Sequence, residues 1–417
     1  MITRVEALNF RCLKWIERDL DAFHVLVGPN ASGKTTFCDV IRFLGRLVSG
    51  GLDDAVGSFT SNFEDLVWQR RGTCFELAIE LRVPDEIMAR LSKKAFDTCR
   101  YQVVIGVHGA ARENAILAEQ VLLLARPQVV KPLPRTLFPD IFEPPRGTLL
   151  VKTGTTKAWT LAGKSASGND NYYRETSKGF EPVFKLGPRR SALGGAPEDE
   201  SGFPVLTWLK RTLVEGVQTL ALNSALMRMP SPPGQKRGLR PDGSNLPWVI
   251  ADLLAKAPAR AEAWIDHLRT ALPDLLSIRT VERPEDRHRY LVVGYRGGLE
   301  APSWVVSDGT LRLLALTLPA YLPDLRGIYL IEEPENGIHP RAVETMFQSL
   351  SSVYDAQVLL ATHSPVILSL AQPEQVLCFG RTGEGAADIV RGPEHPALRD
   401  WKGDPNLSVL YAAGVLG

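Results

Sequence analysis

Apolar residues near both ends of the chain follow the spacing of buried strands that each lead into a helix. Phe23–Val27 is a short apolar run suited to a buried strand, and apolar residues then recur every three or four positions from Phe37 to Val48. In the last third, Gly327–Ile331 and Gln357–Ala361 predict two more buried strands around an amphipathic helix at 343–354. Because strands alternate with helices, the pattern predicts an α/β core with a largely parallel sheet.

The middle of the chain has two other patterns. Phe75–Val83 and Tyr101–Val107 alternate apolar and partly polar residues, as half-buried strands do, and Ile116–Leu124 is a third candidate strand. These stretches predict an antiparallel sheet beside the α/β core. Apolar residues with helical spacing return over Phe203–Leu226 and Leu246–Leu276, which predicts a separate helical lobe.

The stretch between these two parts is rich in residues that interrupt regular structure. Prolines are dense over residues 126–147, which predicts an extended connector. Residues 148–200 are rich in Gly, Ser and Lys with brief hairpin-like stretches, and we expect a mobile insertion there.

Composition limits the environment of the protein more than its function. The chain has 417 residues and a net charge of +1, so any surface for nucleic acid must be a local patch. Its five cysteines are scattered without a Cys-x-x-Cys pair, and no apolar run approaches the ~20 residues of a membrane span. We therefore expect a soluble cytoplasmic protein without membrane contact, disulfides or a zinc site.

The first candidate site lies where the first buried strand meets its helix. Residues 28–36 are Gly-Pro-Asn-Ala-Ser-Gly-Lys-Thr-Thr and match the phosphate-binding P-loop, Gly-x-x-x-x-Gly-Lys-Thr. The match lies between a predicted strand and a predicted helix, as a P-loop does, and this context argues against a chance match. The backbone N–H groups of such a loop and the helix N-terminus surround phosphates. Lys34 is expected on the β- and γ-phosphates of ATP and Thr35 on Mg²⁺. The predicted nucleotide-binding residues are Asn30, Ala31, Ser32, Gly33, Lys34, Thr35 and Thr36.

Candidate acids follow another buried strand. Glu332 and Glu333 come directly after Ile328–Ile331, and ligands of an open α/β sheet lie at the carboxyl ends of its strands. Glu332 is expected to bind Mg²⁺ and Glu333 to polarise the attacking water. Acids after a strand can also cap a following helix, but Pro334 intervenes here. His363 follows the next strand, where it could hydrogen-bond the γ-phosphate or be an ordinary loop residue.

Four segments together resemble the head of an ABC-type ATPase, in particular the RecF/SMC-like and OLD-type group of DNA-repair and phage-defence ATPases. They are Gly28–Thr36, Ser307–Thr310, Ile331–Pro340 and Ala361–Pro365. The opening Asn9-Phe10-Arg11 and the segment Asp242–Leu246 resemble that group too.

The resemblance implies roles for further residues. Ser307 and Gly309 stand where the ABC signature loop stands, touching the γ-phosphate of ATP bound to another subunit, although Ser-Asp-Gly before a helix is also an ordinary N-cap. Gln69 is the candidate for the glutamine that connects the two lobes. Glu332 departs from the Asp that is usual at the Mg²⁺ position, and this departure bears on the ATPase rate.

The architecture that the resemblance implies is a P-loop NTPase of α/β class, an ABC-type ATPase head with an antiparallel β-subdomain and an inserted helical lobe. We predict four parts: an N-terminal ATPase lobe at 1–125, a connector and insertion at 126–200, a helical lobe at 201–298, and a C-terminal ATPase lobe at 299–417.

The expected function is binding and hydrolysis of MgATP with ATP-dependent, head-to-tail homodimerisation, because the P-loop and the signature segment of one chain would serve different nucleotides. The expected setting is DNA repair or anti-phage defence, with control of a partner nuclease or effector. The alternative is an ATP-gated scaffold that hydrolyses slowly and sequesters a toxic effector without acting on DNA. A metabolic P-loop kinase would not explain Ser307–Thr310 together with Ala361–Pro365.

Two further observations bear on nucleic acid and on nuclease activity. OLD-type relatives with their own nuclease carry a Toprim domain after the head, whereas 52 residues follow Pro365 here, so we expect no Toprim domain and no cleavage of DNA or RNA by this chain. Basic residues gather around a predicted strand pair and a loop, where they could contact DNA or form ordinary solvated surface. They are Arg279, Arg283, Arg287, Arg289, Arg296, Lys236, Arg237 and Arg240.

Overall fold

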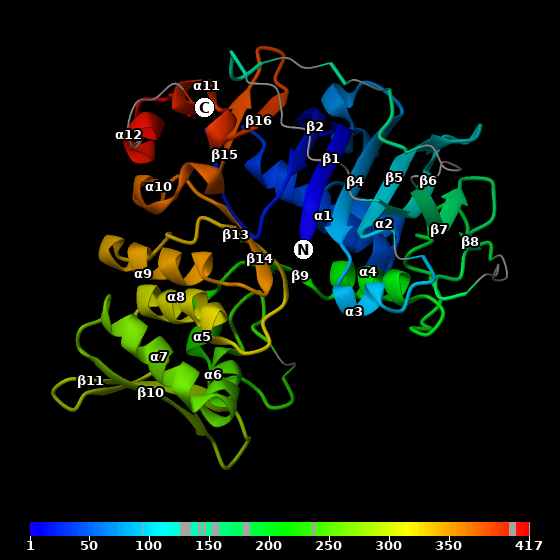
Figure 1. Cartoon of the computed structure of the whole chain (residues 1–417). Coiled ribbons are helices and arrows are strands. Elements are labelled where there is room, and N and C mark those ends of the chain that lie inside the picture. Colours follow the sequence, from blue (N-terminus) through cyan, green and yellow to red (C-terminus); the bar gives the residue numbers. More distant parts are fainter. Residues whose placement is uncertain are drawn as a thin grey trace.

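The computed structural model has two large β-sheets with one helix between them, and a lobe of helices and a small sheet at one side (Figure 1). The structure describes residues 1–93, 95–125, 135–140, 143–144, 147–151, 158–177, 184–235, 238–399 and 406–416. Most of the predicted connector at 126–147, and the basic residues Lys236 and Arg237, lie outside the described residues.

A six-stranded sheet forms the centre of the molecule. Its strands are parallel except for the edge strand at Ala387–Arg391, which pairs antiparallel with its neighbour. In spatial order they are β16 (Ala387–Arg391), β15 (Val376–Arg381), β3 (Phe23–Val27), β14 (Ala356–Ala361), β13 (Gly327–Glu332) and β9 (Val217–Leu220).

Both faces of this sheet are buried, because successive side chains along each strand point to opposite faces and enter different cores. Along β13, Leu330 packs into the core beneath the antiparallel sheet and Ile331 packs into the core on the helical side. β14 does the same with Leu359 and Leu360. The near-continuous apolar runs in the sequence are therefore the mark of a sheet covered on both sides.

The second sheet is antiparallel, and α1 (Lys34–Gly50) lies between it and the central sheet. The apolar face of α1, including Phe37 and Ile41, shares one core with Phe75 and Ile79 of the antiparallel sheet. In spatial order its strands are β2 (Leu13–Asp19), β1 (Ile2–Phe10), β4 (Cys74–Arg82), β5 (Thr98–His108), β6 (Glu113–Leu124), β7 (Ala158–Ser165) and β8 (Asn171–Tyr172).

The opposite face of the central sheet is covered by helices that continue into the side lobe (Figure 1). In that lobe two helices pack on a three-stranded antiparallel sheet, and Trp264 donates from Nε1 to Thr317 Oγ1 at 2.8 Å across the core. The sheet consists of β10 (Leu275–Glu282), β11 (Arg289–Tyr295) and β12 (Glu300–Pro302). The helices of the lobe and the covering layer are α5 (Ser224–Arg228), α6 (Leu246–Lys256), α7 (Pro258–Arg269), α8 (Asp308–Thr317), α9 (Pro340–Ser351), α10 (Pro365–Leu370), α11 (Pro396–Arg399) and α12 (Leu407–Ala412).

Shorter elements surround the antiparallel sheet. They are α2 (Leu52–Gly57), α3 (Asp85–Met88) and α4 (Pro204–Val214), with 3-10 turns at Phe63–Leu66 and Trp68–Arg70. Within the described residues, no helix combines the length and apolar character that crossing a bilayer requires.

The structure corrects the helical prediction for Phe203–Leu226. α4 ends at Val214, and Val217–Leu220 is strand β9, which pairs in parallel with β13 at the edge of the central sheet. The backbone carbonyl of Gly216 accepts from the N–H of Ile328 at 2.8 Å. The extended conformation of Val217–Leu220 therefore depends on a strand more than a hundred residues away in the sequence. α4 packs against α1, and so belongs with the core of the two large sheets rather than with the helical lobe.

Two other boundaries also differ from the expectation. The antiparallel sheet does not end at residue 125, because β7 and β8 from the predicted insertion extend it. The helical pattern predicted through Leu276 ends earlier, since α7 ends at Arg269 and β10 begins at Leu275.

A buried ion cluster stabilises the antiparallel sheet. The Arg100 guanidinium donates from Nη1 to Glu6 Oε1 at 2.7 Å and to Glu80 Oε1 at 2.9 Å, and all three side chains are less than a tenth exposed. Arg100 Nη2 also donates to the backbone carbonyl of Leu149 at 3.0 Å, which ties a covering segment to the sheet. The cluster therefore joins three strands and a loop through one cation.

Arg100→Ala is expected to destabilise the fold strongly, because two buried carboxylates lose their cation. Removing one partner of such a cluster costs about 3–5 kcal/mol of unfolding free energy. Urea unfolding followed by tryptophan fluorescence measures the loss. The control is Arg279→Ala, which removes an ion pair to Glu300. The two side chains of this pair are 48% and 57% exposed, so the change should leave the unfolding midpoint where it is in the wild type. Equal unfolding midpoints for the two variants would contradict this prediction.

Candidate functional site

At each end of the loop between β3 and α1 the backbone has a positive φ that favours glycine. Gly28 has φ of 150° and Gly33 has φ of 106°, both in the region that L side chains rarely adopt. A Cβ on Gly28 would lie 2.2 Å from the Phe379 carbonyl oxygen of β15, so the loop is pressed against a neighbouring strand. Gly33 precedes α1, and no side chain caps the N-terminus of that helix. The first N–H groups of α1 are therefore available to an anion.

Lys34 is a buried cation held by the loop itself. Its ammonium donates to the carbonyl oxygens of Gly28 at 2.7 Å and Pro29 at 2.9 Å. Burial lowers the pKa of Lys34 to about 8, against the opposing effect of the nearby Glu333 and Glu332 carboxylates. A bound phosphate would replace the two neutral carbonyls as the partner of this ammonium and would bring a negative charge to it.

One buried hydroxyl of the loop lacks a hydrogen-bond partner among the described residues. Ser32 is 1% exposed, and its Oγ is a buried polar atom without a hydrogen-bond partner in the described part of the chain. Asn30 and Ala31 are exposed at the rim, and Ala31 has φ of 60°. An orphaned hydroxyl beside an uncapped helix and a buried cation fits a phosphate group.

Glu332, the last residue of β13, meets the loop from the neighbouring part of the sheet. Its Oε2 accepts from Thr35 Oγ1 at 2.9 Å and its Oε1 accepts from Arg42 Nη2 at 2.6 Å. Arg42 also donates to Asp39 Oδ1 at 2.9 Å, and Arg11 pairs with the other oxygen of Asp39. The carboxylate of Glu332 is thus oriented by a network that runs along α1.

Glu333 follows in a strained backbone conformation. Its φ is 47°, which is uncommon for a non-glycine residue, and its N–H donates to the Ala361 carbonyl at 2.8 Å. Asn336 Nδ2 donates to Glu333 Oε2 at 2.5 Å, which holds the exposed carboxylate from one side. The other carboxylate oxygen has no hydrogen bond among the described residues and is open to a ligand or water.

His363 completes the group from the end of β14. Burial and the charge of Lys34 lower the pKa of His363, so its imidazole is neutral near pH 7. The Nδ1 atom of His363 is hydrogen-bonded to the Tyr411 hydroxyl at 2.8 Å.

The P-loop residues, the two acids and His363 line one cavity of about 490 Å³. The cavity brings together the predicted residues Asn30 to Thr36, Glu332, Glu333 and His363, whose individual roles stay predictions. It also includes side chains that were not predicted as site residues. These are Arg11, Cys12 and Arg381, with Gly385 beside them. Arg11 belongs to the Asn-Phe-Arg segment that the resemblance had singled out, whereas Arg381 has no local signal.

Three predicted residues lie outside the lining of this cavity. Ser307 is the N-cap of α8, and its Oγ accepts from the Thr310 N–H at 3.2 Å, so the ordinary N-cap geometry is present. Gly309 lies against the backbone of Gly337, whose carbonyl oxygen would be 2.6 Å from an added Cβ. Gln69 donates to the Glu384 carbonyl at 3.1 Å, next to Gly385 at the cavity rim.

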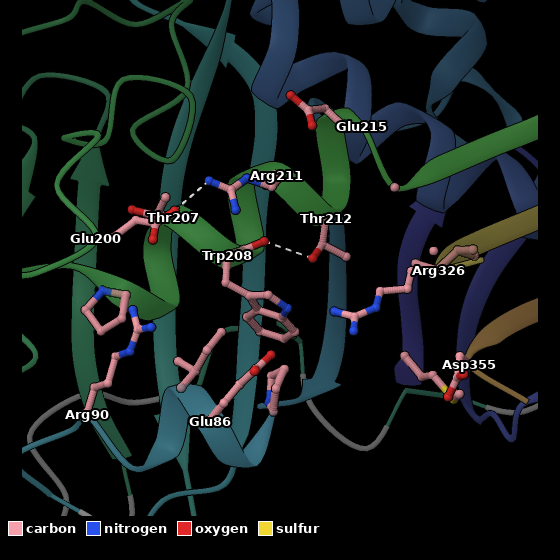
Figure 2. Close-up of a pocket in the computed structure, with 17 residues that line it drawn as sticks. Glu86, Arg90, Glu200, Thr207, Trp208, Arg211, Thr212, Glu215, Arg326 and Asp355 are labelled. Atoms are coloured by element: carbon pink, nitrogen blue, oxygen red, sulfur yellow. Dashed lines mark hydrogen bonds and ion pairs between the residues drawn. The ribbon is translucent and has the colours of Figure 1, made fainter. Parts of the chain in front are cut away.

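A second, larger cavity of about 560 Å³ lies at the opposite ends of the central strands. Figure 2 shows Trp208 of α4 in its middle, with Glu86 of α3 below and Arg326 reaching in from the start of β13. Its charges are mixed, and its lining includes no glycine-rich loop. Phosphate chemistry is therefore assigned to the smaller cavity.

The central parallel sheet, the P-loop on its middle strand and the acids at the end of the neighbouring strand define the fold as that of an ABC-type P-loop ATPase head. A crystal structure of an Smc head bound to the C-winged helix domain of ScpA is similar over 93% of this chain and 97% of that chain, with 13% identity and a TM-score of 0.54. At that identity the similarity shows the fold alone. An SMC head domain from Thermotoga maritima matches at 10% identity over 94% of this chain and 98% of that chain, with a TM-score of 0.43.

Family models identify the chain more closely. The model described as "AAA domain, putative AbiEii toxin, Type IV TA system" matches residues 160–369, which is half of the chain, and the chain belongs to this family. A second model, described as "AAA ATPase domain", matches residues 1–176. The two matches together include the P-loop, both acids and His363.

Gly28→Ala is expected to distort the loop, because the new methyl group would collide with the Phe379 carbonyl and β15 cannot move away freely. We expect a lower melting temperature and at least tenfold weaker binding of a fluorescent ATP analogue. The control is Gly57→Ala, since a Cβ on Gly57 meets no atom within 4 Å. Unchanged nucleotide binding in Gly28→Ala would show that the loop does not need this conformation.

Proposed function

We propose that this chain binds MgATP and hydrolyses the bond to its γ-phosphate. The observation that supports the proposal most directly is the single cavity shared by the P-loop, Glu332, Glu333 and His363. Its composition, a cradle of N–H donors with a cation on one side and carboxylates on the other, suits phosphoryl transfer to water.

The P-loop would bind the phosphates. Lys34 would exchange its two carbonyl partners for phosphate oxygens, and Ser32 Oγ would gain the partner that it lacks. The first exchange replaces neutral acceptors of the ammonium by anionic ones, and the second gives a buried hydroxyl a charged acceptor. The loop would therefore need no change of conformation to bind the phosphates.

Thr35 and Glu332 fit a Mg²⁺ ion, because their oxygens already lie 2.9 Å apart at the end of the β13 strand. When bound, Mg²⁺ supplies positive charge that neutralises the phosphates. Arg42 would keep one oxygen of Glu332 in place, at 2.6 Å, whatever the other oxygen binds. Glu332 is longer than aspartate, and this network fixes the position of its carboxylate.

Glu333 and His363 would act at the γ-phosphate. The unpaired oxygen of Glu333 would accept a hydrogen bond from the attacking water and orient it. His363, neutral because of its lowered pKa, would present an N–H group to a γ-phosphate oxygen.

A second copy of the chain would complete the site. Ser307 and Gly309 lie outside the cavity of their own chain, which supports a role toward a nucleotide on another subunit. Two apolar side chains shortly before Ser307 are exposed, Trp304 by 46% and Val305 by 67%, and Asp308 beside them pairs with Arg228. An exposed apolar patch of this kind is typical of a surface that binds another protein. We infer a head-to-tail homodimer that forms with ATP.

The proposed setting is DNA repair or anti-phage defence, in which the ATP-driven dimer controls a partner nuclease or effector. Two findings support this: the family description names a putative AbiEii toxin and a Type IV TA system, and the similar Smc head is bound to a domain of another protein. The cluster of arginines on β10, β11 and the turn between them is largely neutralised, since Arg279 pairs with Glu300 and both Arg287 and Arg289 pair with Glu282. A protein partner is therefore favoured over DNA at that surface.

The second candidate function is an ATP-gated scaffold that hydrolyses slowly and holds an effector inactive. It is favoured by one observation, that both oxygens of Glu332 are engaged by Thr35 and Arg42. Single-turnover hydrolysis rates compared with the ATP dependence of partner binding would distinguish the two functions.

Glu333→Gln is expected to retain ATP binding and to lower kcat by at least about 100-fold, because the amide keeps the shape but cannot polarise water. Lys34→Ala should instead lose nucleotide affinity, since the main cation of the cavity is removed. Phosphate release and fluorescent-nucleotide titration measure the two effects. Glu344→Gln, a change on the exposed side of α9, is the matched control. Wild-type turnover by Glu333→Gln would rule out Glu333 as the carboxylate that polarises the attacking water.

Val305→Glu is expected to prevent ATP-dependent dimerisation while leaving ATP binding intact, because a charge would be placed in the proposed apolar contact. Light scattering with MgATP, in the Glu333→Gln background that should accumulate the ATP-bound dimer, measures the mass. Tyr354→Glu is the control, since Tyr354 is 85% exposed and precedes β14, at the end of that strand away from the nucleotide cavity. Monomeric protein that hydrolyses ATP at a concentration-independent specific rate would contradict the dimer.

A further inference from the structure

A tyrosine near the C-terminal end of the described chain contacts His363, which lines the nucleotide cavity. Tyr411 belongs to α12, which packs against α10, the helix that begins directly after the His363 loop. Leu407 and Leu410 are 2% and 5% exposed and anchor α12 in the helical-side core. The position of the Tyr411 ring is thus set by packing and not by the cavity itself.

The Tyr411 hydroxyl has two neighbours in the site. It lies 2.8 Å from His363 Nδ1 and 3.4 Å from the Gly28 carbonyl oxygen. It has one proton to donate, so only one neighbour can accept it. The contact with Gly28 is longer than the limit of about 3.0 Å for an ordinary O–H donor bond, whereas the distance to His363 Nδ1 is ordinary. His363 Nδ1 also has no other donor among the described residues, so we infer that it accepts the tyrosine proton.

This choice decides the state of the imidazole ring. In a neutral histidine one ring nitrogen carries the proton and the other accepts. If Nδ1 accepts from Tyr411, the proton is on Nε2, and the remaining N–H group is available as a donor. Without the tyrosine hydroxyl the two tautomers are no longer distinguished, and the tautomer with an unprotonated Nε2 would repel a phosphate oxygen.

We propose that Tyr411 is a positioning residue that holds His363 in the Nε2–H tautomer and in one ring orientation, so that the imidazole donates to the γ-phosphate. This inference rests on the proposed ATPase function, but it makes a claim about the free protein as well. A segment from the far end of the chain would then set the hydrogen-bonding state of the γ-phosphate contact.

The direct test is ¹⁵N NMR of histidine-labelled protein without nucleotide, with the His363 signals assigned by their loss in His363→Ala. In the wild type we expect the shifts of an Nε2–H tautomer. In Tyr411→Phe, which keeps the ring and removes only the hydroxyl, we expect shifts averaged between both tautomers. Tyr354→Phe, at an exposed tyrosine away from the cavity, should leave the His363 signals unchanged. Identical His363 shifts in the wild type and Tyr411→Phe would overturn the proposal.

Kinetics gives the second test. Tyr411→Phe should lower kcat about five- to tenfold, the usual effect of one lost hydrogen bond, with the KM for ATP unchanged. In the His363→Ala background the same change should have no further effect, because Tyr411 acts through that ring. An equal loss in both backgrounds would mean that Tyr411 acts elsewhere and would refute the proposal. A wild type without turnover would refute the proposed function, whereas the NMR comparison would still decide the role of Tyr411.

Discussion

The register of the central parallel sheet is the constraint on which the rest of the molecule depends. Glu332 is paired with Ala361, and Ala361 with Leu26, so three strand ends from distant parts of the sequence lie level with one another. The residues that follow these ends are the second acid, the His363 loop and the P-loop. A slip of one residue would send every side chain of a strand into the opposite core, among neighbours that it does not fit. Burial on two faces therefore determines the geometry of the site.

The charged groups of the cavity already have hydrogen-bond partners in the free protein, and a ligand can replace some of these partners. The Lys34 ammonium rests on two backbone carbonyls, and the Glu332 carboxylate rests on a hydroxyl and a guanidinium. Both ions have hydrogen-bond partners, but those of Lys34 are neutral, and burial still lowers the pKa of its ammonium to about 8. Phosphate is a stronger partner than a carbonyl for the ammonium, and the exchange gives binding energy without requiring a new loop conformation.

Sequence reasoning was sufficient where a local signal coincided with a strand end. The α/β class, the P-loop and the closeness of Glu332, Glu333 and His363 followed from apolar runs that each end in polar residues. It failed where the conformation depends on a distant partner. β9 is four residues long and exists because β13 pairs with it, and β7 and β8 exist because they extend a sheet edge. Arg42, Arg381 and Tyr411 have no motif around them, and Tyr411 meets Gly28 across 383 positions of sequence.

The loop after β13 connects the two halves of the proposed composite site within one chain. Glu333 is held by Asn336, and the next residue, Gly337, lies so close to Gly309 that no side chain fits at position 309. The signature-like segment therefore packs against the loop that carries Glu333, the proposed catalytic carboxylate. In the proposed dimer, Glu333 faces the nucleotide of its own chain whereas Ser307 and Gly309 face the nucleotide of the other. Any shift of the Glu333 loop after hydrolysis must then displace Gly309, because tightly packed backbone moves as a unit. The two nucleotide sites would be coupled through this single contact.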